Sequence, residues 1–320
     1  RRRKGRWALA VILTEVDARH IFVKGDICDK ALVTDLIAKY DPDYVINFAA
    51  ESHVDRSIRN PEIFVESNVL GTVNLLQCCK DAWYDADAKT WKEGKKYLQV
   101  STDEVYGALG AEGYFMETTP LCPHSPYSAS KASADMFVKA FHDTYGMPIN
   151  ITRCSNNYGP YQFPEKLIPL LINNAKHHKT LPVYGDGMQI RDWLYVMDHC
   201  KAIDMVANGG KDGEVYNVGG HNERPNIFIV KTIINQLHDR LQDEGISEDL
   251  IKHVADRLGH DRRYGIDPTK IKNDLGWYPE TPFEKGIVLT IDWYLNHQEW
   301  MDHVTSGDYQ NYYQDMYKNK

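Results

Sequence analysis

YLQVSTDEVYG, residues 97–107, joins an apolar run to a cluster of polar side chains. The run Tyr97–Val100 has the pattern of a short buried strand. Thr102, Asp103 and Glu104 then stand at its carboxyl end, the edge where open α/β sheets bind ligands. The stretch therefore predicts one strand of a parallel sheet with a functional site at its end.

A second stretch, YSASK at 127–131, places a phenol and an ammonium on one face of a helix, because Tyr127 and Lys131 are four residues apart. An ammonium beside a phenol favours the phenolate, which can take a proton from a sugar hydroxyl. Either motif alone is a weak signal, since Tyr-x3-Lys pairs recur in helices and an Asp-Glu pair is usually a solvated turn. Together, in this order, they indicate hydride transfer coupled to acid–base elimination.

Longer blocks surround these two motifs. From about Asp26 to its C-terminus the chain resembles the extended short-chain dehydrogenase/reductase family, and within it the sugar-nucleotide 4,6-dehydratases. Besides STDEVYG, the resemblance rests on AAESHVDRS (49–57), SPYSASKASAD (125–135), NNYGPYQFPEKLIP (156–169), QIRDWLYV (189–196), YNVGGHNE (216–223) and GHDRRY (259–264).

Strand-like runs alternate with helical stretches, which is the pattern of a doubly wound parallel sheet. Strands are predicted at 20–24, 44–48, 97–100 and 148–152. A helix follows Tyr127, with an apolar stripe at Met136, Phe137, Ala140, Phe141 and Tyr145. The plain role of the stripe is packing, and the resemblance implies that this helix also forms part of a dimer interface. We expect a Rossmann-like α/β fold with incomplete N-terminal strands and a smaller α+β lobe. Residues 1–155 would form the NAD-binding domain, with 190–220 returning to it, and 156–320 the nucleotide-sugar-binding lobe.

The resemblance implies an NAD-dependent lyase that converts dTDP-glucose to dTDP-4-keto-6-deoxyglucose and water, in deoxysugar biosynthesis. Tyr127, assisted by Lys131, takes the C4 hydroxyl proton, and Thr102 donates a hydrogen bond to the forming carbonyl. Glu104 then removes the C5 proton, and a protonated Asp103 gives its proton to the leaving C6 hydroxyl. Asp103 must stay neutral near neutral pH, which requires burial or the charge of Glu104 to raise its pKa.

The resemblance also implies two sets of binding residues. The cofactor set is Asp26, Ile27, Phe48, Ala49, Ala50, Glu51, Ser52, Ser67, Tyr127, Lys131 and Asn157, with Asp26 at the adenine and Asn157 near the nicotinamide. The substrate set is Ser52, Thr102, Asn156, Lys166, Leu167, Pro182, Val183, Tyr184, Arg191, Asn226, Asp256, Arg257, Leu258, Gly259 and His260.

Plainer roles stay open for several of these residues. Asp26 and Asn157 could equally be cap or turn residues, which Asp and Asn favour. Arg191 and Arg257 suit phosphate oxygens because guanidinium donates in a planar fork, but each could be an exposed surface arginine. Tyr184 could belong to the core instead of stacking on a base.

The N-terminal segment departs from the family. Residues 1–20 read RRRKGRWALAVILTEVDARH, and only Gly5 and Gly25 precede Asp26, whereas the family opens with a strand, a Gly-rich turn and a helix that hold the cofactor pyrophosphate. A chain beginning at Arg1 is therefore expected to bind NAD weakly or not at all, to be poorly stable and to have little activity. The basic run before ALAVIL imitates a secretory signal, but the apolar run is short and has no A-x-A-like site.

Three alternatives remain. A 4-epimerase of the same family shares the Tyr/Lys pair but lacks adjacent carboxylates at the Asp103-Glu104 positions. A UDP-glucose 4,6-dehydratase shares STDEVYG, and the blocks QIRDWLYV and GHDRRY favour dTDP-glucose over it. An inactive or non-catalytic binding protein is the alternative of a different class.

Composition limits the partners. A net charge of −8 over 320 residues argues against nucleic acid, which needs a basic surface. No apolar segment approaches the roughly 20 residues that span a bilayer. Six cysteines and thirteen histidines show no metal-ligand spacing, so we expect no metal and free thiols in the cytoplasm. The family resemblance implies a homodimer.

Overall fold

The computed structural model of the chain describes residues 20–307, so the predictions made for residues 1–19 lie outside the described residues. Its contacts divide the chain into two compact units. The first holds the described residues up to Val105 together with Leu121–Arg153 and Met205–Tyr216. The second holds Tyr106–Pro120, Cys154–Asp204 and the described residues from Asn217 onward. The cofactor-binding and substrate-binding roles assigned to the two parts of the chain stay predictions.

A four-stranded sheet in the order β1-β4-β5-β9 forms the centre of the first unit. Strand β1 pairs in parallel with β4, and Tyr44 lies opposite Lys96. Because the two strands are parallel, their carboxyl ends reach the same edge of the sheet. The strands are β1 (Tyr44–Asn47), β4 (Lys96–Thr102), β5 (Ile149–Cys154) and β9 (Val215–Val218).

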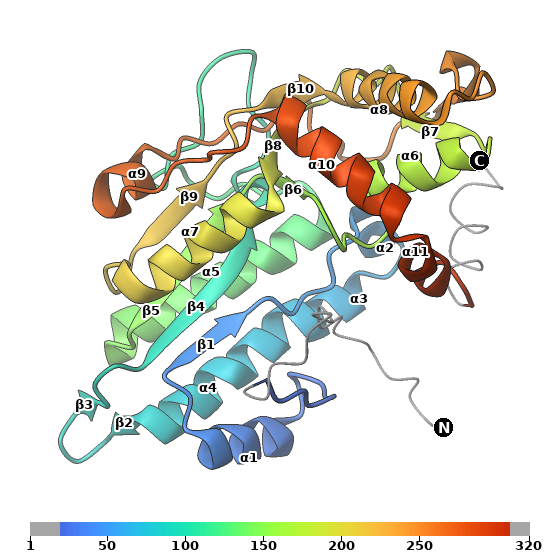
Figure 1. Ribbon diagram of the computed structural model, residues 1–320. Coiled ribbons are helices and arrows are strands. Elements are labelled where there is room, and N and C mark those ends of the chain that lie inside the picture. Colours follow the sequence, from blue (N-terminus) through green and yellow to red (C-terminus); the bar gives the residue numbers. More distant parts are fainter. Residues whose placement is uncertain (1–19, 308–320) are drawn as a thin grey trace. The chain divides into compact units, whose positions relative to one another are not determined.

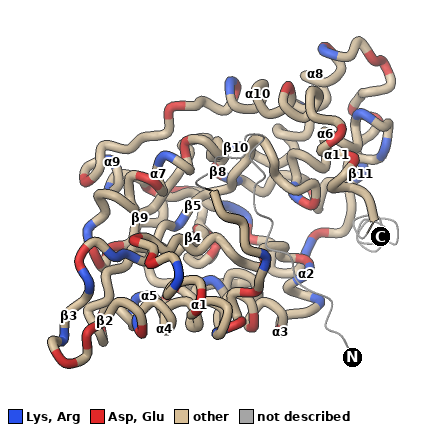
Figure 2. The backbone as a smooth tube through the Cα atoms, turned by 60° about the horizontal axis from the view of Figure 1, so that its bottom comes forward, with Lys and Arg blue, Asp and Glu red and all other residues tan. Residues whose placement is uncertain are grey.

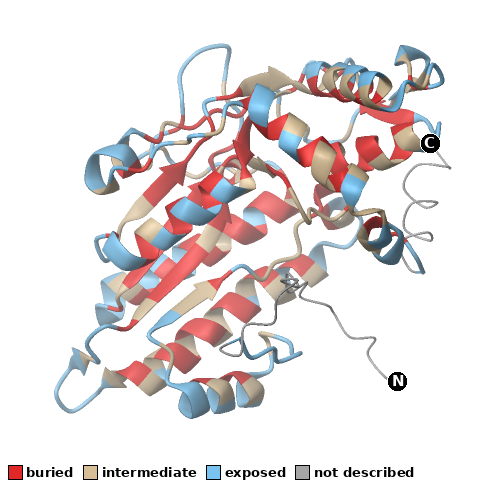
Figure 3. Cartoon of the chain, viewed as in Figure 1, coloured by how far each residue is buried: buried red, intermediate tan, exposed pale blue. Residues whose placement is uncertain are grey.

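Helices α1, α4 and α5 belong to the same unit as this sheet, and α4 packs against both α1 and α5 (Figure 1). The buried side chains of these helices and of the sheet form one core, which includes Trp83 of α4, Val138 of α5, Tyr97 of β4 and Ile149 of β5. Figure 3 shows the inner faces of α4 and α5 as buried. Besides β1, the elements before β4 are α1 (Lys30–Tyr40), α2 (Val54–Arg59), α3 (Pro61–Phe64), the π-helix η1 (Val65–Leu70), α4 (Gly71–Trp83) and the hairpin of β2 (Tyr84–Asp85) and β3 (Thr90–Trp91).

Helix α5 (Pro126–Tyr145) begins and ends where its sequence requires. Ser125 and Ser128 form a reciprocal capping box, and Pro126 occupies the first turn. Gly146 closes the helix at a φ of 67°, a left-handed conformation that glycine adopts without strain. These signals fix the start of the helix and therefore place Tyr127 in its first turn.

The predicted Rossmann-like fold and the strands near 44, 97 and 148 are confirmed, but two expectations are wrong. Residues 20–24 form no strand, and Ile21, Phe22 and Val23 are exposed. An extended segment becomes a strand only by pairing, and this one is not part of the β1-β4-β5-β9 sheet.

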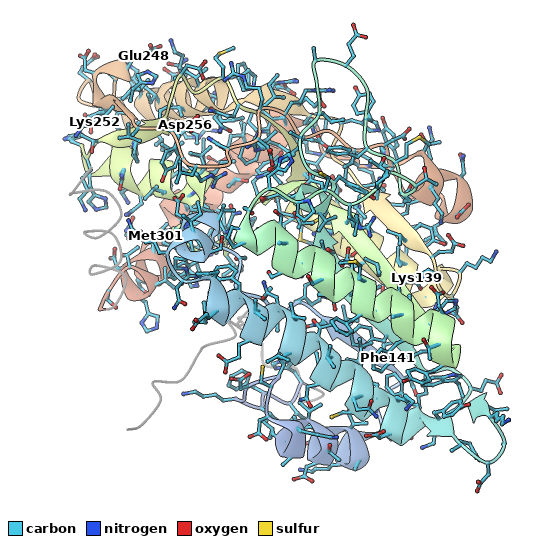
Figure 4. All side chains as sticks on the ribbon, turned by 180° about the vertical axis from the view of Figure 1, so that it is seen from behind. Lys139, Phe141, Glu248, Lys252, Asp256 and Met301 are labelled. Carbon is cyan, nitrogen blue, oxygen red and sulfur yellow. The ribbon has the colours of Figure 1, made fainter. Side chains whose placement is uncertain are left out.

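The second wrong expectation is that the whole apolar stripe of α5 packs on the core, whereas the dimer-interface role of the helix stays a prediction. Met136 and Phe137 are exposed, whereas Phe141 is buried. In Figure 4, Phe141 and the exposed Lys139 lie on different faces of this helix. The face that packs on the core is instead polar or small at several positions, among them Ser130, Lys131, Ala134 and Asp135.

The second unit contains a three-stranded sheet in the order β10-β8-β6 and a parallel pair of β11 and β7. Its strands are β6 (Asn156–Tyr158), β7 (Leu181–Tyr184), β8 (Ile190–Tyr195), β10 (Glu223–Pro225) and β11 (Ile251–Val254). Its helices are α6 (Leu167–Lys176), α8 (Asn226–Leu241), η3 (Glu248–Leu250), α9 (Thr269–Leu275), α10 (Phe283–Asn296) and α11 (Gln298–Val304). Helix α7 (Val196–Gly209) begins in this unit, and its last residues belong to the first.

Charges of both signs are interspersed along the described chain (Figure 2). No helix among residues 20–307 is both long and apolar enough to cross a membrane. In the same part of the chain, no group of three His, Cys, Asp or Glu side chains could hold a metal ion. All six cysteines are free thiols.

Candidate active site

The acidic cluster lies where the sequence predicted it. Thr102 is the last residue of β4, and Asp103 and Glu104 open the short 3₁₀ helix η2 (Asp103–Tyr106). The Thr102 hydroxyl donates to Asp103 Oδ1 over 3.3 Å and accepts from the Glu104 amide over 3.3 Å. Asp103 is 1% exposed and Glu104 is half-buried. The burial that the acid role of Asp103 requires is therefore present, while its protonation stays a prediction.

Tyr127 and Lys131 are both buried on α5, in the same unit as the acidic cluster. The Lys131 ammonium donates to the carbonyl oxygen of Val100 over 2.7 Å, which joins the helix to β4 two residues before Thr102. The Tyr127 ring meets Phe64 edge to face, with centroids 6.3 Å apart. The helix that carries Tyr127 and Lys131 is thus bonded to the strand that leads directly into Asp103 and Glu104.

A buried ion pair fixes α5 against the neighbouring strand. Arg153 of β5 donates from Nε to Asp135 Oδ2 over 2.9 Å, and both side chains are buried. A buried ion pair adds little net stability, because taking two charges out of water offsets their attraction. It fixes the geometry, since removing either partner would leave an uncompensated buried charge. Lys131 and Asp135 lie one helical turn apart, so α5 is bonded to both β4 and β5 within one turn.

Sequence reasoning missed Asn68, which connects the loop after β1 to helix α5. It is buried in η1, and its Oδ1 accepts from the Glu51 amide over 2.8 Å. Its Nδ2 donates to the Glu51 carbonyl (2.9 Å) and to Ser130 Oγ (2.8 Å). Ser130 Oγ donates in turn to the Tyr127 carbonyl over 2.7 Å. Asn is unfavourable inside a helix, so an Asn within this helical segment was the signal that the sequence offered. The structure adds that the turn is π-helical, a feature that often marks a functional site.

Asn68→Ala should lower the free energy of unfolding by about 1–3 kcal/mol, because it leaves buried polar groups without their partner. Urea unfolding measures the change. The matched control is Asn60→Ala, since Asn60 is exposed and its side chain makes no cap hydrogen bond. Equal losses in the two variants would show that the Asn68 bridge does not stabilise the site.

The predicted cofactor residues of the first unit lie near the ends of β1 and α1. Asp26 is exposed, and its Oδ1 accepts from the Cys28 amide over 2.9 Å, which supports its plainer role in a turn. Ile27 packs on Gly71, where a Cβ would lie 2.5 Å from Ile27 Cδ1. Phe48 is 61% exposed. The remaining members are half-buried: Ala49, Ala50, Glu51 and Ser52 in the loop after β1, and Ser67 in η1.

One group of predicted substrate residues meets in the second unit. His260 Nδ1 lies 2.6 Å from Asp256 Oδ1 (Asp256 is labelled in Figure 4), and its ring faces Tyr184 edge-on at 6.1 Å. Gln189, which the sequence did not single out, donates to Asp256 Oδ2 over 2.9 Å. The backbone N–H of Asn226 donates to the Gln189 backbone carbonyl, which connects Asn226 to the group.

Ionisation within this group has clear causes. Burial, together with the positive charge of Arg257, lowers the pKa of His260 to about 4, although Asp256 opposes the shift. Burial also acts against the charge on Asp256, but hydrogen bonds from His260 and the Arg257 amide outweigh it and lower the pKa of that carboxyl. The His260–Asp256 contact is therefore a hydrogen bond from a neutral imidazole at neutral pH.

Arg191 is buried, so the interpretation as an exposed surface arginine is wrong for this residue. Its guanidinium donates to the carbonyls of Ile190 and Asp261 and lies 4.2 Å from the centre of the Tyr264 ring. Other substrate residues stand on separate elements of the unit. They are Asn156 at the start of β6, Lys166 and Leu167 at the start of α6, the buried Pro182 and Val183 in β7, and the exposed Leu258 and Gly259 after β11.

Comparisons with known proteins agree on one family. The sequence model described as GDP-mannose 4,6 dehydratase matches residues 6–290. The dTDP-glucose 4,6-dehydratase of Xanthomonas campestris pv. campestris (strain B100) is 56% identical over 297 residues, which cover 92% of this chain and 84% of that protein. The dTDP-glucose 4,6-dehydratase 1 of Escherichia coli (strain K12) is 49% identical, with coverages of 94% and 86%.

Solved structures show the same likeness. DesIV, the dTDP-glucose 4,6-dehydratase from Streptomyces venezuelae solved with NAD and TYD bound, has a TM-score of 0.82 and 43% identity, covering 91% of this chain and 84% of that one. The UDP-glucose 4-epimerase of Thermus thermophilus in complex with NAD has a TM-score of 0.76 at 25% identity, with coverages of 85% and 84%.

Proposed function

The chain belongs to the GDP-mannose 4,6 dehydratase family, and from this premise we propose that it is an NAD-dependent hydro-lyase that converts dTDP-glucose to dTDP-4-keto-6-deoxyglucose and water. One observation supports this reaction above all. The Asp103-Glu104 pair and the Tyr127-Lys131 pair lie in one unit, and the Lys131–Val100 hydrogen bond holds α5 on the strand that leads into Asp103 and Glu104. Adjacent carboxylates supply the acid and base that elimination needs and that oxidation alone does not.

The described residues fit a nicotinamide nucleotide. The carboxylate of Asp26 is exposed and so accessible to an adenine, although one of its oxygens also accepts from the Cys28 amide. The Lys131 ammonium of α5 contacts the parallel strand β4, whose carboxyl end carries Thr102. NAD, when bound, supplies the hydride acceptor at C4 and the hydride donor at C6. The residues that would hold it are the cofactor set predicted from the sequence.

Helix α5 carries out the oxidation at C4. Tyr127 takes the hydroxyl proton, and the ammonium of Lys131, one helical turn away, stabilises the phenolate that does so. Thr102 donates a hydrogen bond to the carbonyl that forms. Because Lys131 is held by the Val100 carbonyl, its charge keeps a fixed position relative to β4.

The two carboxyl side chains at the start of the short helix η2 act in the elimination. A carbonyl at C4 acidifies the proton at C5, which Glu104 removes. Asp103 gives its proton to the C6 hydroxyl, which leaves as water. The hydrogen from C4 ends at C6, and the protonated Glu104 gives its proton back to C5. The sugar therefore loses one water and keeps its oxidation level.

Incubation of the purified chain with dTDP-glucose tests the function. We expect a product lighter by one water with its carbonyl at C4, detected by mass spectrometry and NMR, and slower turnover of UDP-glucose. Faster turnover of UDP-glucose would contradict the choice of nucleotide. A C4 epimer without mass loss would identify an epimerase. Unchanged sugar nucleotide would favour the non-catalytic alternative or the low activity expected of a chain that begins at Arg1. A version with a strand, a Gly-rich turn and a helix upstream of Asp26 separates these two, because only the second would regain turnover.

We also propose a homodimer formed through the helices of the first unit. Large apolar side chains are exposed there: Met136 and Phe137 on α5, and Val65 and Leu70 on η1. Exposed apolar patches of this kind mark protein–protein interfaces. Free thiols at all six cysteines support a reducing cytoplasm as the location, and a 4-keto-6-deoxy product supports a place in deoxysugar biosynthesis.

Phe137→Glu should convert the dimer to a monomer, because a carboxylate would be buried without a partner at the interface. Light scattering after size exclusion gives the mass. The matched control is Met197→Glu on α7, where an apolar side chain is also exposed, at 53% against 42% for Phe137, but in the other unit. A wild-type chain that runs as a monomer, or a Phe137→Glu variant that stays dimeric, would contradict this interface.

A further inference from the structure

His199 makes a buried contact that the proposed reaction does not use. It lies on α7, is 6% exposed, and its Nδ1 is 2.9 Å from Asn157 Oδ1 on β6. Asn157 Nδ2 donates to the Ser155 carbonyl over 3.0 Å and contacts Cys154 Sγ at 3.3 Å. These residues all belong to the second unit.

The partners of the Asn157 carboxamide fix both its orientation and the tautomer of His199. A carbonyl oxygen such as that of Ser155 can only accept, so the atom beside it must be the amide nitrogen of Asn157. Oδ1 then faces His199 and can only accept. His199 Nδ1 must therefore carry the ring proton, which leaves Nε2 as a bare acceptor.

The other ring atom shows that this histidine is not a simple packing residue. Nε2 is buried and has no hydrogen-bond partner among residues 20–307. Leaving a buried polar atom unsatisfied is costly, and an apolar side chain at this position would avoid that cost. Burial also lowers the pKa of His199 to about 4, so the ring is neutral at neutral pH.

We infer that His199 is a positioning residue whose Nδ1–H holds the Asn157 carboxamide with Oδ1 presented as a hydrogen-bond acceptor. Oδ1 has two lone pairs, and His199 occupies one. The donor suited to the other is the carboxamide NH2 of the nicotinamide, near which Asn157 is assigned. This last step rests on the proposed function.

Two substitutions separate positioning from packing. His199→Asn keeps an N–H donor at the same number of bonds from Cβ as Nδ1, whereas His199→Leu fills similar space without one. His199→Leu should weaken NAD binding and lower kcat by about 3- to 10-fold, the value of one hydrogen bond, with the KM for dTDP-glucose unchanged. His199→Asn should restore both to within about twofold. Equal losses in the two variants would overturn the inference.

A double-mutant cycle tests whether His199 acts through Asn157. In an Asn157→Ala background, His199→Leu should change NAD affinity by less than about twofold, because the carboxamide it positions is gone. Effects that multiply independently would show that His199 acts by another route, and would overturn the inference. Cys200→Ala, at an exposed neighbouring position of α7, is the control for general disturbance of the helix.

The tautomer is a readout that needs no activity. Nitrogen chemical shifts of ¹⁵N-labelled protein should show His199 as a neutral ring protonated at Nδ1. A ring protonated at Nε2, or an imidazolium at neutral pH, would overturn the inference even in an active enzyme. A wild-type chain with the expected tautomer but no bound NAD and no dehydration would overturn the proposed function and, with it, the role of Asn157 toward the cofactor.

Discussion

Glu104→Gln is expected to slow formation of the 4-keto-6-deoxy product by about two to four powers of ten, because the amide cannot remove the C5 proton. Oxidation at C4 does not use Glu104, so the variant should still produce the absorbance of reduced nicotinamide after dTDP-glucose is added. Single-turnover mixing, with product quenched and counted by mass, follows both signals. Glu104 lies in η2 and is half-buried, so the isosteric amide should leave the local fold intact.

The matched control is Glu93→Gln, an exposed carboxylate of the same unit, which should turn over at the wild-type rate. Unchanged product release by Glu104→Gln would move the C5 base to another residue. Loss of the reduced-nicotinamide signal along with the product would place Glu104 in the oxidation step and contradict the division of roles between α5 and η2.

Tyr127→Phe should remove both signals. Oxidation comes first, and without the phenol nothing takes the C4 hydroxyl proton, so we expect a loss of about two to four powers of ten in reduced-nicotinamide absorbance and in product alike. Tyr145→Phe, at the exposed end of the same helix, should have no effect and serves as the control. A Tyr127→Phe variant that still accumulates reduced nicotinamide would assign the first proton transfer to a different group.

The positions of the polar residues at the end of β4 were easier to predict than the buried hydrogen bonds around them. Thr102, Asp103 and Glu104 follow an apolar run, and strand ends in parallel sheets collect ligands, so their place could be derived from order alone. Asn68 could not, because its partners Glu51 and Ser130 come from two other elements that tertiary packing brings together. The burial of Arg191 has the same origin, since one of its partners is the distant carbonyl of Asp261.

The two wrong fold predictions also have physical causes. Periodicity finds an apolar face on α5 but does not say whether the core or another chain covers it, and here Met136 and Phe137 face outward. Residues 20–24 have the composition of a strand, but strand formation depends on a partner and not on composition alone. Signals that act locally agree with the structure, since Ser125 caps the start of α5 and Gly146 ends it.

Internal redox transfer is the central claim, and the fate of the hydrogen at C4 tests it most directly. The purified chain is given dTDP-glucose that carries deuterium at C4, and the product is examined by NMR. We predict that the deuterium appears at C6 of the 4-keto-6-deoxy sugar, because the hydride taken from C4 is the one returned. Deuterium lost to solvent, or a product with only hydrogen at C6, would contradict the account.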